Sequence, residues 1–197
     1  MNRILKFFYR IYRSLIPVPA IVIAGPFIVL GWLSSRVHGT ITEPALVLSR
    51  IPFLLGEKAR LFYYKALLQS VGRHVTFKYG SFCQYRNTRI GNRVFVGYFN
   101  ALGDVTIGDN VLFGGYVNVL SGLRQHAFED PDRLIMDTPA EGRRTVTIGA
   151  DVWIGSNSVI ASDIGNRCVV AACSVVVKEV EDHSLVGGNP ARLIRKI

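Results

Sequence analysis

Histidine is the side chain best suited to take a proton from a hydroxyl group near neutral pH, and the sequence contains four histidines. His38 lies in a basic, apolar segment, and His74 follows Arg73 where a repeated region begins. His183 precedes a C-terminal motif and is most simply a solvated turn residue. His126 alone lies in a long polar stretch, which makes it the candidate general base.

That polar stretch, residues 121–145, is the one interruption of the repeated region. Such an excursion is long for a loop, and long ordered loops more often carry function than decoration. Glu129, Asp130 and Asp132 follow His126 closely and could orient its second ring nitrogen. The sequence predicts a functional loop around His126, with a merely structural loop histidine as the alternative.

The three cysteines, Cys83, Cys168 and Cys173, are too few and too irregularly spaced for a disulfide framework or a zinc knuckle. The histidines also lack the spaced set of three that a catalytic metal site needs. We therefore expect no metal site, and nothing indicates an oxidising compartment.

From about Val71 an aliphatic residue returns every six positions. Units that start with an aliphatic residue and a glycine begin at Ile90, Ile107, Ile148 and Ile164, and a weaker one begins at Val71. A period of six fits neither an amphipathic helix nor an alternating strand. It predicts a triangular solenoid in which three short strands close one coil, the aliphatic side chains point inward and glycine permits the corner backbone. We expect about five coils over residues 71–197.

The first 75 residues carry ten Lys/Arg and two acidic residues, whereas the remainder is nearly neutral. Residues 14–35 hold no charge and are long enough to cross a hydrocarbon core as one helix. Pro17, Pro19 and Pro26 are expected to kink or break that helix, so that the segment enters and leaves on one face. Basic residues among aliphatic runs favour an anionic membrane surface over nucleic acid as partner.

Residues 1–70 are thus expected to form a membrane-associated helical region, and residues 71–197 the β domain. Residues 44–56 are too short to span a membrane and are expected to be interfacial. Residues 57–70 are typical of an amphipathic helix with Lys58, Arg60 and Lys65 off its apolar stripe. The alternative is an ordinary apolar cap on the β domain.

Three segments follow the pattern of a known family: residues 151–156, residues 172–178 and the run Val186-Gly-Gly-Asn-Pro-Ala-Arg192. With the hexads they resemble the hexapeptide-repeat acyltransferases, which fold as a left-handed parallel β-helix, and in particular the branch of maltose and xenobiotic acetyltransferases. The first third and the loop resemble O-acetyltransferases that modify surface polysaccharides. The resemblance implies a homotrimer with sites between subunits and direct transfer from acetyl-CoA.

The same resemblance implies roles for individual residues. His126 falls where the catalytic histidine projects, and Asn100 matches a position that contacts the acceptor or the oxyanion, with a coil-corner role as the alternative. Cys173 stands where the family has a glycine, which narrows the expected cofactor path. The positions implied for acetyl-CoA are Trp153, Ser156, Ala172 and Val177, with Lys178, Arg192 and Arg195 near the nucleotide phosphates. Trp153 could equally be a packing residue, and the two arginines a solvated tail.

Together these features predict an acetyl-CoA-dependent O-acetyltransferase at the cytoplasmic face of a bacterial inner membrane, held there by a re-entrant or monotopic segment. Its expected acceptor is a sugar hydroxyl on a lipid-linked or nascent surface polysaccharide. Two alternatives stay open: a soluble acceptor such as a free sugar or a drug, and a non-catalytic trimeric scaffold. The sequence does not identify the sugar.

Overall fold

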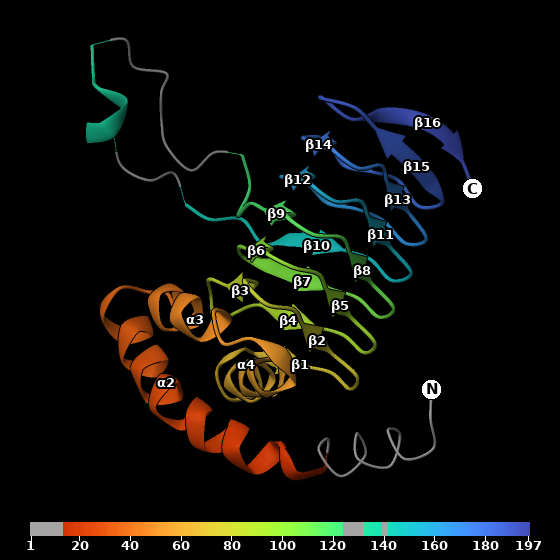
Figure 1. The fold of residues 1–197 in the computed structure, drawn as a ribbon. Coiled ribbons are helices and arrows are strands. Elements are labelled where there is room, and N and C mark those ends of the chain that lie inside the picture. The colour runs from red at the N-terminus through yellow and green to blue at the C-terminus, as the bar shows by residue number, and fades with distance from the viewer. Residues whose placement is uncertain (1–13, 124–131, 139–141) are drawn as a thin grey trace, which may run out of the picture.

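The structure, a computed structural model, describes residues 14–123, 132–138 and 142–197. Three helices come first and a three-walled β-solenoid follows them (Figure 1). The helices are α2 (Pro17–Val37), α3 (Thr42–Ser49) and α4 (Phe53–Leu67). In the excursion, a short 3₁₀ helix, η1 (Ile135–Asp137), lies away from the walls of the solenoid (Figure 1).

Short strands stack into three sheets, one for each wall of the solenoid. Sheet A contains β1 (Ser70–Val71), β4 (Arg89–Ile90), β7 (Val105–Ile107) and β10 (Val146–Ile148). Sheet B contains β2 (Thr76–Phe77), β5 (Phe95–Val96), β8 (Leu112–Phe113), β11 (Trp153–Ile154), β13 (Val169–Val170), β15 (Ser184–Gly187) and the antiparallel β16 (Arg192–Lys196). Sheet C contains β3 (Phe82–Cys83), β6 (Ala101–Leu102), β9 (Asn118–Val119), β12 (Val159–Ile160) and β14 (Val175–Val176).

The predicted parallel β-solenoid is confirmed, but it has about six turns rather than five. The additional turn comes from β15, in which Val186 lies opposite Val170 of β13. The five coils expected from the sequence were the units that begin at Val71, Ile90, Ile107, Ile148 and Ile164, and the residues of β15 follow the last of these units. Backbone pairing continues beyond that unit, since a parallel neighbour needs only a free strand edge.

The core of the solenoid consists of the side chains that recur every six residues. A coil with three walls and three corners brings each sixth residue to the same inward orientation, so these side chains form one continuous apolar column. In the first coil Phe77 and Cys83 take these positions and are fully buried. The predicted inward residues of the later coils are each at most 2% exposed: Ile90, Val96, Leu102, Ile107, Phe113, Val119, Ile148, Ile154, Ile160, Ile164, Val170 and Val176.

The glycines of the repeat do not have the role expected from the sequence. None of those that follow the first aliphatic residue has a positive φ; the left-handed residues come two positions later, as at Asn110 (φ 59°). Instead, the glycines allow neighbouring coils to approach closely. A Cβ atom on Gly108 would lie 2.7 Å from the carbonyl carbon of Gly149 in the next coil. A side chain there would push two stacked backbones apart.

Asn and Asp side chains after these glycines tie successive coils together. The backbone N–H of Asn92 donates to Asp109 Oδ1 at 2.6 Å, and that of Asn166 donates to Asp182 Oδ1 at 2.6 Å. These hydrogen bonds lower the pKa of both aspartates below its ordinary value. Each carboxylate therefore stabilises the solenoid above its ordinary titration range and loses that contribution as the pH falls through its lowered folded-state pKa.

Ala150 interrupts this column, because alanine offers no side-chain acceptor to the N–H of Asp109 in the coil before it. Asn166 makes that contact one coil later, accepting the N–H of Ala150 at 2.9 Å. We expect Ala150→Asn to stabilise the solenoid by about 0.5–1.5 kcal/mol in urea unfolding, the usual net value of one hydrogen bond. Ala150→Gln is the matched control, since its amide lies one carbon too far out; equal effects of the two substitutions would contradict this prediction.

Helices α3 and α4 close the first coil of the solenoid. The Tyr63 hydroxyl donates to the Ile41 carbonyl at 3.1 Å, and the Tyr64 hydroxyl accepts the N–H of Cys83 at 3.1 Å. The ring of Tyr64 packs on Phe77, with centroids 4.4 Å apart. These contacts supply the cap that a solenoid end requires.

The structure bears on three expectations about the helical region. Arg60 was assigned to the polar side of its helix, but it is 1% exposed and lies on the buried face of α4. Residues 44–56 were expected to be interfacial; Pro44, Ala45 and Leu48 are buried while Val47 and Phe53 are exposed, and the interfacial location stays a prediction. The proline-containing run was expected to kink or break; it does not break, since α2 is one continuous helix with Pro17 at its start and Pro26 inside. A proline in the first turn removes no helical hydrogen bond.

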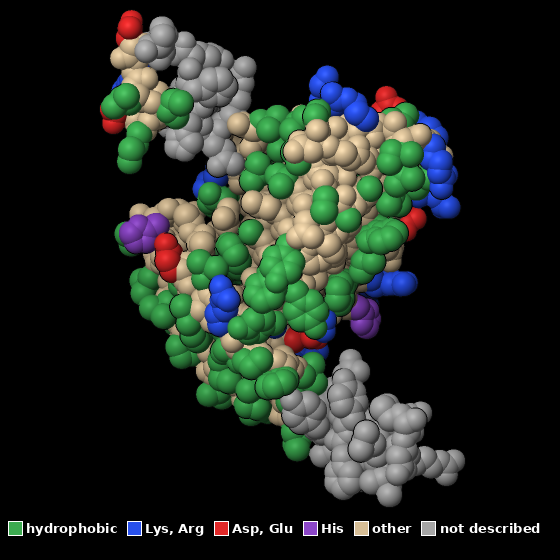
Figure 2. Space-filling view, turned by 45° about the horizontal axis from the view of Figure 1, so that its top comes forward, with side chains coloured by type: hydrophobic (Ala, Val, Ile, Leu, Met, Phe, Trp, Pro, Cys, Tyr) green, Lys and Arg blue, Asp and Glu red, His purple; other side chains and the backbone are tan. Residues whose placement is uncertain are grey.

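Helix α2 has two different apolar faces. Ala20, Ala24 and Gly31 are buried on the face that packs on the other helices. The opposite face is exposed, with Val22 at 69% and Val37 at 74% (Figure 2, lower part). In the described part of the chain, α2 is the one helix with the length and composition to cross a membrane, a test that core helices and signal sequences also pass.

Candidate functional site

The excursion begins and returns at one corner of the solenoid, between sheets C and A. Asp104 holds both of its ends. The Asp104 N–H donates to Ser121 Oγ at 2.9 Å, and Thr145 Oγ1 donates to Asp104 Oδ1 at 2.9 Å. The N–H of Arg144 also donates to the Ser121 carbonyl at 3.0 Å. The root of the loop is therefore fixed to the β-core on both sides.

A cavity of about 750 Å³ lies at this root. Arg143 and Arg144 line it together with Ala161 and Ser162, which follow β12. Arg144 forms an ion pair with Asp163, and the guanidinium of Arg143 stacks 4.2 Å from the centroid of the Tyr85 ring. These two arginines were not predicted as site residues, because their position beside the cavity depends on how the loop returns to the solenoid.

His126, the predicted base, lies outside the described residues, as do Glu129 and Asp130. Its place in the chain is between Leu123 and Gly142, which both line the cavity. Its role stays a prediction.

Asn100 lies at another corner, between sheets B and C. It is fully buried, its Oδ1 accepts the N–H of Val117 at 2.8 Å, and its Nδ2 donates to the Gly114 carbonyl at 2.9 Å. These contacts fit the coil-corner interpretation. Contact with an acceptor stays a prediction for this residue.

Two of the residues implied for the cofactor lie beside the loop root. Val177 and Lys178 follow directly after β14, which pairs with β12. Ala161 and Ser162 follow β12 and line the cavity, and the N–H of Ala161 donates to the Val176 carbonyl at 2.8 Å. A thin, extended ligand that runs along this corner would therefore pass from the cavity to Lys178.

The other implied residues are distributed around the solenoid. Ser156 and Ala172 lie at the corner between sheets B and C, and Ser156 Oγ accepts the N–H of Gly115 at 3.1 Å. Trp153 points outward from sheet B with 53% of its surface exposed, a position that fits both the cofactor contact and the alternative of packing on the outer face of the solenoid. Lys178 and Arg192 line one cavity of about 370 Å³, which Arg195 does not line. The structure thus brings Lys178 and Arg192 together but leaves Arg195 apart.

The third basic residue of that cavity is already engaged within the chain. Lys196 Nζ lies 2.9 Å from Glu181 Oε2 and 3.1 Å from Ser184 Oγ. Lys178 and Arg192 form no ion pair within the described ranges 14–123, 132–138 and 142–197, so both can meet an anionic ligand. No set of three His, Cys, Asp or Glu side chains suited to a metal ion occurs among those residues.

The solenoid matches known proteins in sequence and in structure. A family model for the hexapeptide repeat of succinyl-transferase matches residues 145–178. The maltose O-acetyltransferase of Clostridium difficile 630 superposes with a TM-score of 0.68 and 26% identity, over 78% of this chain and 82% of that one. The chain therefore carries the hexapeptide repeat and is similar in sequence and fold to the hexapeptide-repeat acyltransferases.

Other family members extend this result. A hexapeptide-repeat acetyltransferase of Vibrio cholerae, solved with acetyl coenzyme A, superposes with a TM-score of 0.59 and 29% identity, over 77% of this chain and 84% of that one. A probable macrolide acetyltransferase of Lysinibacillus sphaericus is 34% identical over 54% of this chain and 62% of its own length. The galactoside O-acetyltransferase of Escherichia coli K12 is 34% identical over 62% and 58%. The match thus spans about three-fifths of these curated relatives.

Proposed function

We propose that this hexapeptide-repeat protein is an acetyl-CoA-dependent O-acetyltransferase that modifies a sugar hydroxyl of a lipid-linked or nascent surface glycan. The observation that supports the proposal is the presence of two features in one protein chain. A solenoid of the acetyltransferase type has a loop rooted on a basic cavity, and an apolar helix face lies exposed at its capped end. Relatives that act on galactosides and maltose support a sugar hydroxyl as acceptor.

The proposed reaction needs one base and no covalent enzyme intermediate. An imidazole nitrogen of His126 takes the hydroxyl proton while the acceptor oxygen attacks the thioester carbonyl carbon. The tetrahedral intermediate collapses, the carbon–sulfur bond breaks, and the imidazolium returns its proton to the departing thiolate. The products are an O-acetyl ester and free coenzyme A.

Lys178 and Arg192 are the residues of this chain best placed to hold the nucleotide phosphates of the donor. They line one cavity and form charge-assisted hydrogen bonds with phosphate oxygens. Val177 and Lys178 follow β14, which pairs with β12 beside the loop root, so the thioester end of the donor is proposed to extend from this cavity towards the loop root.

The active unit in this proposal is a homotrimer with its sites between subunits. Loop residues Leu134, Ile135 and Met136 support it, because they are 72%, 59% and 94% exposed and form an apolar surface that a second copy would cover. Trp153, Ser156 and Ala172 lie away from the loop root of their own chain. In a trimer these residues would meet the loop of a neighbouring subunit instead.

Membrane attachment is proposed to be monotopic. One face of α2 packs on α4 and the other is apolar and exposed, as expected of a helix that lies in the plane of the interface. The solenoid then stays on the side where acetyl-CoA is made, the cytoplasmic face of a bacterial inner membrane.

Cys173 provides a native probe of this topology. It is the exposed cysteine, whereas Cys83 and Cys168 are buried and burial raises the pKa of both thiols. A membrane-impermeant maleimide is expected to label the protein in inverted vesicles but not in intact spheroplasts, and Cys173→Ser should abolish the labelling. Labelling in intact spheroplasts would place the solenoid outside and contradict the proposed location.

The acceptor is tested by offering labelled acetyl-CoA and three acceptors to the purified full chain. We expect label in lipid-extractable glycan from membranes, with much less in free galactosides, maltose or chloramphenicol. Faster transfer to a free sugar or drug would favour the soluble-acceptor alternative. Absence of both acetyl-CoA binding and transfer would favour a non-catalytic scaffold.

A further inference from the structure

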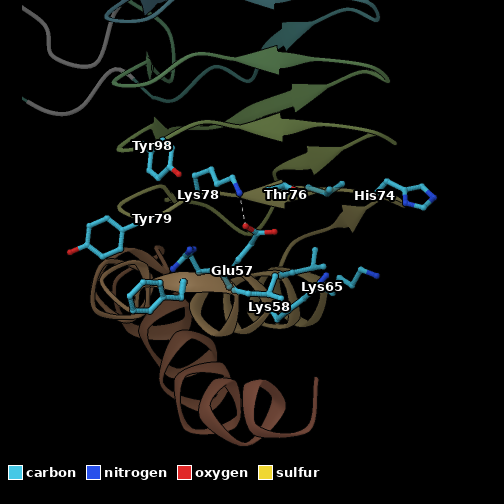
Figure 3. Close-up of a pocket in the computed structure, with 14 residues that line it drawn as sticks. Glu57, Lys58, Lys65, His74, Thr76, Lys78, Tyr79 and Tyr98 are labelled. Atoms are coloured by element: carbon cyan, nitrogen blue, oxygen red, sulfur yellow. Dashed lines mark hydrogen bonds and ion pairs between the residues drawn. The ribbon is translucent and has the colours of Figure 1, made fainter. Parts of the chain in front are cut away.

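A third basic pocket, which shares no lining residue with the two cavities above, lies between α4 and the first two coils of the solenoid (Figure 3). Its volume is about 540 Å³, and we call it the α4 pocket. Glu57, Lys58 and Lys65 reach it from α4, and Lys78 and Tyr98 from the coils. It was not predicted, because its two walls come from parts of the chain that meet only in the fold.

The α4 pocket has a strongly cationic lining. Four Lys/Arg side chains face one carboxylate, Glu57, which lies 2.7 Å from Lys78 Nζ. After this pair is formed, Lys58, Arg60 and Lys65 remain without a carboxylate partner among the described residues. Such a concentration of charge within one pocket attracts an anion with more than one negative charge.

Arg60 is the most unusual of these residues, because it is charged and only 1% exposed. Its Nε donates to the Phe77 carbonyl at 3.1 Å, and its Nη1 donates to the Ile51 and Ser49 carbonyls at 2.9 and 3.2 Å. Nη2 makes no hydrogen bond to the described part of the chain, although Arg60 lines the pocket. Burial also lowers the pKa of Arg60. An anion in the pocket would compensate a buried charge whose hydrogen bonds go to backbone carbonyls and whose nearby carboxylate, Glu57, is already paired with Lys78.

The position of the pocket indicates where such an anion comes from. α4 lies between α2 and the solenoid (Figure 1), so the pocket is on the solenoid side of α4 and the exposed apolar face of α2 is on the other side. If α2 lies in the interface, the pocket lies beyond it by about one helix diameter, ~10 Å, within reach of a headgroup that extends from the membrane. Tyr98, 53% exposed, lines the pocket on the side of the solenoid and offers a ring and a hydroxyl to a sugar.

We propose that the α4 pocket binds the diphosphate that joins a lipid to its glycan, and so anchors the acceptor beside the membrane while its sugars extend along the solenoid. This inference rests on the proposed function, because it names the acceptor as a lipid diphosphate. Lys58 and Lys65 supply charge-assisted hydrogen bonds to the phosphate oxygens. Arg60 supplies the buried charge, and its hydrogen bonds to carbonyls also hold α3, α4 and β2 together.

The test uses the full chain and phosphatidylcholine vesicles that carry polyisoprenyl diphosphate. The variant is Lys58→Gln/Lys65→Gln, because neither lysine forms a hydrogen bond or ion pair within the described residues, unlike Arg60 and Lys78. We expect the wild type to bind these vesicles more tightly than plain ones. The affinity of the variant for them should fall by at least about tenfold, because the loss of one hydrogen bond to a charged group is enough to lower an affinity by that factor. Binding to plain vesicles, through α2, should be equal in both proteins.

Two controls make the result specific. Arg89→Gln/Arg167→Gln removes the same charge from exposed positions outside the pocket and should change nothing. Vesicles with phosphatidylglycerol at matched surface charge, and soluble inorganic diphosphate as competitor, separate a bound diphosphate from a general attraction to negative membranes.

Three outcomes would overturn the inference. The first is equal binding of the wild type to vesicles with phosphatidylglycerol and to vesicles with polyisoprenyl diphosphate. The second is an unchanged affinity of the Lys58→Gln/Lys65→Gln variant for the diphosphate vesicles. The third is a failure of inorganic diphosphate to displace either protein from those vesicles. The assay needs no catalysis. Correct vesicle binding without acetyl transfer would therefore reject the proposed function alone, and acetyl transfer with unaltered vesicle binding in the variant would reject this inference alone.

Discussion

His126→Ala is expected to lower acetyl transfer by about 10²–10⁴-fold, which is the usual contribution of a positioned general base. The acceptor hydroxyl keeps its proton at neutral pH, so without a base its oxygen is a poor nucleophile towards the thioester. Affinity for acetyl-CoA and the oligomeric state should be unchanged, because the roots of the loop are held by Asp104 and not by the substituted residue. The measurement is the initial rate of labelled acetyl transfer at saturating donor.

The matched control is His183→Asn. His183 is an exposed corner histidine of the solenoid with φ 57°, a conformation that asparagine tolerates, and it lies outside the loop. Its substitution should leave the rate within about twofold of the wild type, as expected of a surface change. Transfer that survives His126→Ala, or that falls equally in both variants, would remove the role assigned to His126.

Gly108→Ala is expected to destabilise the solenoid by about 3 kcal/mol, at the upper end of what overpacking costs. The new Cβ atom would lie 2.7 Å from the carbonyl carbon of Gly149 and 2.8 Å from the amide nitrogen of Ala150. Both are backbone atoms of the next coil, held by the stacking hydrogen bonds on either side, so they cannot turn aside as a side chain can. Urea unfolding of the purified protein measures the loss.

Gly115→Ala is the matched control within the same solenoid. A Cβ atom there would meet only the carbonyl oxygen of Tyr98, at an ordinary contact distance of 3.4 Å. Its effect should be within about 0.5 kcal/mol. Equal losses at Gly108 and Gly115 would show that helical or strand propensity, and not the close approach of two coils, sets the cost.

The sequence predicted the solenoid well because a single spacing rule determines it. A side chain that returns every six residues can be inward on all three walls only if each wall and corner together take six residues, and Ile90, Val96 and Leu102 are indeed buried. The role of glycine was predicted wrongly. Gly108 approaches Gly149 across two neighbouring coils, and the sequence around Gly108 does not show which residue will lie opposite it.

The helical region was predicted less well, for a related reason. Arg60 follows the pattern of a solvent-facing residue, but its partners are carbonyls of Ser49, Ile51 and Phe77, which only the folded chain brings together. The α4 pocket and the cavity at the loop root are likewise assembled from distant segments. A histidine in an unusual loop can be selected from sequence, whereas the cavity beside it cannot.

The most direct test of the account is whether the purified chain moves labelled acetyl from acetyl-CoA to lipid-extractable glycan in a form that mild alkali releases. Release by alkali identifies an oxygen ester. The account predicts label that appears in the glycan, is lost on alkaline treatment, and is absent with His126→Ala. Label that resists alkali, or a glycan that stays unlabelled while the protein binds acetyl-CoA, would contradict it.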